Sequence, residues 1–183
     1  MSSVLLLESH PSNLTSVVEH VAVELHGGLN ETMVLKFIIL ADIDRLKIPL
    51  AVPVGLDAPT DNLWMHTCFE LFVGEDGETG YTEFNFSPSG QWAVYHFDDY
   101  RIGMRPDVLE LPVISVEEFD GRLTATIDLG YRFYGDSLNV GLSAIIEETD
   151  GAKSYWALAH PPGKPDFHHK DCFALQLKAP SGA

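Results

Sequence analysis

Nearly every apolar segment of this chain alternates apolar and polar side chains with a period of two residues. In the segment 122–129, for example, Leu123, Ala125, Ile127 and Leu129 fall on one side and polar residues fall on the other. Successive side chains of a β-strand point to opposite faces of a sheet, so this period is typical of strands with one buried face. No segment shows the helical period of about 3.6 residues over several turns. The pattern therefore predicts an all-β chain.

The alternating segments are spread over the whole sequence and are divided by turn-forming residues. A chain of 183 residues is long enough to bury a core as one domain. Roughly ten short strands divided by turns are typical of a β-sandwich or jelly roll. We therefore predict a single-domain, jelly-roll-like β-sandwich over residues 1–183. The expected strands are 4–8, 17–27, 33–41, 63–73, 81–87, 91–97, 113–119, 122–129, 138–147, 154–159 and 172–177.

The chain is strongly acidic, with 11 Lys and Arg against 27 Asp and Glu and a formal net charge of -16. A negative field of this size repels phosphate backbones and anionic lipids, so we expect neither nucleic acid nor a membrane as a partner. The N-terminus lacks the basic region of a signal sequence, and no apolar stretch is long enough to cross a membrane. We therefore expect a cytoplasmic protein in which Cys68 and Cys172 are reduced.

Two neighbouring segments, 63–73 and 81–87, each have one mainly apolar face and one polar and aromatic face. Met65 falls on the apolar face of the first segment. The Gly-rich stretch 74–80 between them has the composition of a hairpin loop. We predict that the polar face forms a solvent-accessible cavity for a polar ligand, roofed by the loops that contain Arg101 and residues 160–169. The predicted binding residues are Trp64, His66, Glu70, Glu83, Asn85, Tyr95, Arg101, His160, Lys164, His168 and His169.

Each of these residue types also has an ordinary structural interpretation. Polar residues on alternate strand positions are typical of a solvated sheet face, and tryptophan in a sandwich is usually a core residue. The histidines and cysteines include zinc-ligand types, but the chain has no Cys-x2-Cys or His-x3-His spacing, so we predict no metal site. Glu70 and Glu83 are a candidate carboxylate pair for glycoside hydrolysis, which requires a separation of about 5–9.5 Å that a sequence does not define.

Four runs of sequence resemble the small bacterial DOMON-like proteins, which are related to the DOMON and family-nine carbohydrate-binding-module superfamily. They are LWMHTCFE (63–70), YTEFNFSPSGQW (81–92), YRIGM (100–104) and HPPGKPDFHH (160–169). The resemblance covers nearly the whole chain. It implies a jelly-roll sandwich with a ligand site on one sheet or at its rim, and members of the superfamily bind sugars or haem. In the sugar-binding branch tryptophans hold the ligand, and in the haem-binding branch a Met and a His are the axial ligands.

Taken together, these patterns predict a non-catalytic module that binds a small polar ligand, with a carbohydrate or sugar derivative as the leading candidate. The first alternative is a haem- or metal-binding domain with a redox or sensing role. The second is an enzyme that acts on glycosides through Glu70 and Glu83. The leading prediction requires no cofactor, and the first alternative would require haem or a divalent cation.

Overall fold

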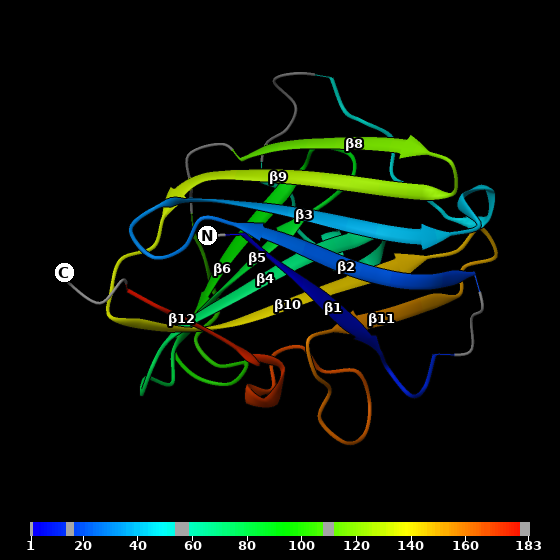
Figure 1. The fold of residues 1–183 in the computed structure, drawn as a ribbon. Helices are drawn as coiled ribbons and strands as arrows, with labels where there is room; N and C mark the ends of the chain where they lie inside the picture. The colour runs from blue at the N-terminus through cyan, green and yellow to red at the C-terminus, as the bar shows by residue number, and fades with distance from the viewer. Residues whose placement is uncertain (1, 14–16, 54–58, 108–111, 180–183) are drawn as a thin grey trace.

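The computed structural model describes residues 2–13, 17–53, 59–107 and 112–179. Over these residues the chain forms twelve strands and three short 3-10 helices. All the pairings between these strands are antiparallel, and the strands form a strongly curled sheet that folds into two layers (Figure 1). The prediction of an all-β, sandwich-like fold is confirmed.

The first layer, which we call sheet A, presents one face to the core and one to solvent. Alternate residues of its central strands are buried, which is the pattern expected for strands with one face in a core. The edge strand β8 has no buried residue. In spatial order, sheet A consists of β1 (Ser2–Ser9), β2 (Val18–His26), β3 (Thr32–Ala41), β9 (Arg122–Arg132) and β8 (Val113–Phe119).

The second layer, sheet B, carries both segments of the predicted polar face. Its spatial order is β7 (Arg105–Pro106), β6 (Trp92–Phe97), β5 (Tyr81–Phe86), β4 (Cys68–Glu75) and β10 (Ser137–Glu147), and then β11 (Lys153–Ala157) and β12 (Leu175–Lys178). Both β11 and β12 pair with β10, at opposite ends of that strand. Strand β1 connects the layers, because most of it pairs with β2 while Glu8 and Ser9 pair with β11.

The main hydrophobic core lies between the two sheets. The Phe37 ring of β3 stacks on the Phe69 ring of β4 with 4.8 Å between centroids, which joins the layers directly. Leu71 and Phe84 of sheet B also face this core, as their alternation in sequence predicts. Burying apolar surface between two sheets is the main favourable contribution to the stability of such a fold.

The opposite face of sheet B is covered by loops instead of by another sheet. A second, smaller cluster forms there, in which Phe72, Phe97 and Ile145 of the strands contact Phe167 and Cys172 of the covering chain. Gly141 of β10 has no side chain, so the covering chain can approach sheet B closely at this position. A Cβ atom at Gly141 would lie 3.2 Å from the Cys172 carbonyl oxygen and 3.3 Å from the Cβ of Phe72.

One expected strand begins later than the sequence predicted. Residues Leu63–Met65 form a 3-10 helix, η2, and β4 starts only at Cys68. The turn begins at Asn62, which adopts a left-handed backbone conformation with φ of 65°, and its carbonyl accepts the N–H of Met65 at 3.0 Å. The placement of Met65 in the apolar core was therefore wrong, since its side chain is 54% exposed.

Smaller corrections concern the C-terminal segments. The strand expected at 154–159 ends at Ala157. Part of the strand expected at 172–177 is a 3-10 helix, η3 (Lys170–Cys172), and β12 begins at Leu175. Cys68 and Cys172 are buried free thiols. Within the described ranges, no helix has both the length and the apolar character needed to cross a bilayer.

Candidate functional site

A pocket of about 490 Å³ lies between the outer face of sheet B and the loops that cover it. We call it the acid pocket. Its aromatic lining consists of Trp64, Phe72, Phe97, Tyr155 and Phe167, and its ionisable lining consists of Glu70, Glu83, Arg101, Lys153 and His168. Two other hollows, of about 360 and 590 Å³, surround the turn between β4 and β5 and contain neither of these glutamates.

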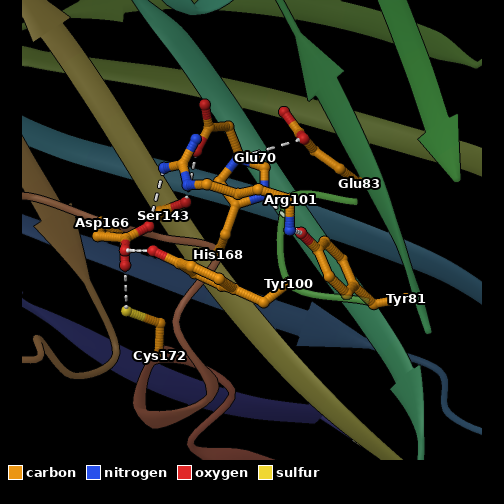
Figure 2. Close-up of polar contacts among 9 residues, drawn as sticks. All are labelled: Glu70, Tyr81, Glu83, Tyr100, Arg101, Ser143, Asp166, His168 and Cys172. Carbon is orange, nitrogen blue, oxygen red and sulfur yellow. Dashed lines mark hydrogen bonds and ion pairs between the residues drawn. The ribbon is translucent and has the colours of Figure 1, made fainter. Parts of the chain in front are cut away.

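The two glutamates come from neighbouring strands, as Figure 2 shows. Glu70 lies opposite Asn85, and Phe72 opposite Glu83, so the glutamates are diagonal neighbours on one face of the sheet. Their exposed fractions are only 3% and 5%. The Oε2 atom of Glu70 accepts a hydrogen bond of 2.8 Å from the Ser143 hydroxyl. The Oε1 atom of Glu83 accepts one of 2.7 Å from the Asn85 amide.

The position of these carboxyl groups changes their protonation. Burial, and next the negative charge of Glu83, raise the pKa of the Glu70 carboxyl from 4.5 to about 8, although the hydrogen bond from Ser143 opposes the change. Burial likewise raises the pKa of Glu83, against the hydrogen bond from Asn85 and the positive charge of Arg101. Two like charges on neighbouring strands cannot both form easily where the side chains are buried, so the pair retains a proton at neutral pH.

An ion pair ties together the two loops that border the pocket. The Nη2 atom of Arg101, in the loop 98–104, donates to Oδ1 of Asp166, in the loop 158–169, at 2.8 Å. The hydroxyl of Tyr100 donates to the other oxygen of the same carboxylate (Figure 2). Burial alone would raise the pKa of Asp166, but the hydrogen bonds from Tyr100 and Arg101 outweigh it and lower that pKa. Asp166 is therefore ionised and balances the charge of Arg101.

A chain of hydrogen bonds fixes the His168 ring beside the glutamates. The Tyr81 hydroxyl accepts the backbone N–H of Arg101 at 3.2 Å and lies 2.7 Å from Nδ1 of His168. The Nε2 atom of the same ring faces Oε2 of Glu83 at 3.7 Å. Burial, with the charge of Arg101, lowers the pKa of His168 to about 4. The ring is thus neutral at pH 7.

Five predicted binding residues meet in the acid pocket: Trp64, Glu70, Glu83, Arg101 and His168. Two others support the pocket without lining it. Asn85 is completely buried and holds Glu83 in place, so its predicted exposure to a cavity was wrong. The Tyr95 hydroxyl donates to Asp61, and its ring packs edge-on against Trp64 with 5.9 Å between centroids.

The remaining four predicted residues lie elsewhere, because each is engaged or exposed outside the pocket. His66 was expected on the strand face with Trp64, but it follows η2, and its Nδ1 lies 2.7 Å from Oε2 of Glu147. The Nζ atom of Lys47 contacts the other oxygen of Glu147 at 2.9 Å, so His66 belongs to a separate ionic cluster.

His160, His169 and Lys164 also lie outside the acid pocket, because each is engaged or exposed elsewhere. The Nε2 atom of His160 lies 2.9 Å from the backbone oxygen of Glu8. His169 packs edge-on against Tyr100 with 6.4 Å between centroids, and its Nδ1 accepts the N–H of Asp171 at 3.2 Å. Lys164 is exposed in the loop and does not line the acid pocket.

Several site residues were not predicted from the sequence. Tyr81 lies two residues before Glu83 and therefore on the same face of the strand, which the alternation of the sequence already indicated. Nothing local in the sequence marks Asp166, Ser143, Lys153 or Tyr155, because each comes from a segment far along the chain from Glu70 and Glu83. Their roles depend on pairings across sheet B and on the loop that folds over it.

The pocket lining contains residue types that the haem alternative would use. Met65, Met104 and His168 all line the pocket, and Nδ1 of His168 lies 2.7 Å from the Tyr81 hydroxyl. In the described part of the chain, no group of three or more His, Cys, Asp or Glu side chains is arranged to hold a metal ion.

Comparison with known proteins yields a structural relative. No family model matches the sequence, and no curated protein is significantly similar to it. The fold resembles the crystal structure of a "putative carbohydrate-binding protein" from Bacteroides uniformis, with a TM-score of 0.62 and 12% sequence identity. The similarity covers 93% of this chain and 84% of the other. At this identity it shows a shared fold.

Proposed function

We propose that this chain is a module that binds a small carbohydrate or sugar derivative in the acid pocket without altering it chemically. The observation that carries the proposal is the presence, in one pocket, of aromatic side chains and buried carboxylates. Sugar rings present C–H faces that pack on aromatic rings, and their hydroxyls donate to carboxylates. The name of the structural relative, a "putative carbohydrate-binding protein", supports the same ligand class.

The contacts of the two glutamates favour a ligand that donates hydrogen bonds. Among the described residues, Ser143 is the only hydrogen-bond partner of Glu70, and its bond leaves the second oxygen of Glu70 without one. Glu83 has Asn85 on one oxygen, and only the distant Nε2 of His168 near the other. A ligand hydroxyl that donates to either of these oxygens would add a hydrogen bond that the described residues do not supply.

A glycan array followed by calorimetry with the best ligand tests this proposal. We expect Trp64→Ala to weaken binding by about 2 kcal/mol or more, because it removes an aromatic wall of the pocket. Phe119→Ala is the matched control, since this aromatic is 81% exposed on β8, away from the pocket. Absence of binding to every glycan, or equal losses in both variants, would contradict the proposal.

A second candidate is an enzyme that acts on glycosides. It is favoured by one observation, namely that Glu70 and Glu83 line the same pocket with raised pKa values, as a general acid requires. Release of nitrophenol from a panel of nitrophenyl glycosides measures this activity. If the wild type releases nitrophenol and both Glu70→Gln and Glu83→Gln do not, the hypothesis of an enzyme replaces that of a binding module.

A further inference from the structure

Among the described residues, the two glutamates of the acid pocket form no ion pair with a lysine or an arginine. Within the described ranges, no Lys or Arg forms an ion pair with Glu70, and the one ion-pair contact of Glu83 is His168, which is neutral at pH 7. Arg101 is the nearest candidate, but its guanidinium is paired with Asp166. A carboxylate of such low exposure normally has a cation or several donors around it.

We infer that the pocket selects a sugar that carries a protonated amino group, held between the carboxylates of Glu70 and Glu83. This inference rests on the function proposed above and narrows its ligand class. An ammonium group has three N–H donors and one positive charge. It would supply hydrogen bonds to the oxygens that Ser143 and Asn85 leave unbonded, and its positive charge would replace the proton that the empty pair retains.

The aromatic lining suits the same group. Trp64, Phe72, Phe97, Tyr155 and Phe167 all line the pocket that holds the glutamates. Aromatic faces attract cations, and the attraction is larger where water is excluded. A neutral hydroxyl could donate only one hydrogen bond in the same place, and a sugar carboxylate placed there would face the carboxyl groups of Glu70 and Glu83. The lining therefore distinguishes the three kinds of sugar by charge.

The other ionisable groups around the glutamates leave this charge balance unchanged. Arg101 and Asp166 cancel each other across the two loops. Burial, with the charge of Arg101, lowers the pKa of His168 and keeps its ring neutral at pH 7. Lys153 lines the pocket from β11, but no ion pair links it to either glutamate. Among the described residues, neither Lys153 nor Arg101 therefore forms an ion pair with Glu70 or Glu83.

Binding of an ammonium group has a signature that binding of a neutral sugar lacks. The empty pair of glutamates retains a proton at pH 7, and a bound cation favours ionisation of both. Amino-sugar binding must therefore release protons into the buffer. Calorimetry in two buffers with different ionisation enthalpies measures this release on the wild-type protein, without any substitution.

The test is an array of gluco-, galacto- and manno-configured glycans, each presented in 2-hydroxy, 2-acetamido and 2-amino form. We expect the wild type to bind an amino form about tenfold or more tightly than its hydroxyl counterpart, the ratio typical of a charged hydrogen bond. Glu70→Gln and Glu83→Gln should each reduce this ratio towards one. Glu75→Gln, an exposed site on the same strand outside the acid pocket, should leave it unchanged.

The possible outcomes separate the inference from the function on which it rests. If hydroxyl or acetamido forms bind as tightly as amino forms, or if amino forms bind without proton release, the inference is wrong and the carbohydrate module stands. If amino forms are preferred equally by the wild type and both glutamine variants, the amine is recognised elsewhere and the inference is again wrong. If no form binds, the proposed function itself is overturned.

Discussion

Replacing Glu70 with glutamine should change the pH dependence of stability in one direction only. Glutamine keeps an oxygen that can accept the Ser143 hydroxyl, but it never ionises. In the wild type, folding raises the pKa of Glu70, chiefly through burial and next through Glu83, from 4.5 to about 8. Between these values the folded state binds more protons than the unfolded state, so ionisation of Glu70 destabilises the fold as the pH rises.

The magnitude follows from the size of this change. Each pKa unit corresponds to about 1.4 kcal/mol, so a rise from 4.5 to about 8 is a difference on the order of 4 kcal/mol between pH 5 and pH 8. For a protein of this length, 1 kcal/mol shifts the melting temperature by about 2–4 °C. The melting temperature of Glu70→Gln, minus that of the wild type, should therefore increase by on the order of 10 °C over this range.

Differential scanning calorimetry at intervals from pH 5 to pH 8 measures this difference. Taking the difference removes the contributions of the ionisable groups that do not interact with Glu70. Glu75→Gln, exposed on the same strand, is the matched control. In a Glu83→Gln background the effect of Glu70→Gln should be smaller, because one cause of the raised pKa is gone. If the melting temperatures of the wild type and Glu70→Gln differed by the same amount at every pH, the reasoning would be refuted.

Three other predictions concern the fold around the pocket. Phe37→Ala removes a ring stacked between the two sheets and should cost about 3–5 kcal/mol in urea denaturation; a loss below 1 kcal/mol would contradict the packing described. Burial alone would raise the pKa of Glu147, but its bonds to Lys47 and His66 outweigh it and lower that pKa. Glu147→Gln should therefore be less stable than the wild type near pH 7, with the gap closing in acid, and a gap that widens in acid would be the wrong sign. Gly141→Ala places a Cβ 3.2 Å from the Cys172 carbonyl oxygen, so the segment that contains Cys172 must move away from sheet B. Alkylation of the Cys172 thiol in the folded protein should therefore become faster, and an unchanged rate would contradict this prediction.

The strand face of the site was predictable because parity is a local property of an extended chain. Once residues 81–86 are a strand, Tyr81, Glu83 and Asn85 must share one face whatever surrounds them. The same rule put Glu70 on the outer face and Phe69 and Leu71 in the core. The strand assignment of Trp64 and His66 was wrong because it extended the strand through a 3-10 turn, which alternation cannot distinguish over so few residues. Trp64 lines the acid pocket nonetheless.

The sequence by itself therefore determined the all-β class, the polar face of β4 and β5, and the acidic character of the chain. Only the tertiary structure decided that this face is enclosed rather than solvated. Enclosure depends on contacts between residues far apart in the sequence, such as the ion pair of Arg101 with Asp166 and the bond of Ser143 to Glu70. The sequence of a strand does not show whether water or a loop lies above one of its carboxylates. Its pKa and its need for a partner are set by that loop, because the free energy of a charge depends on what replaces water around it.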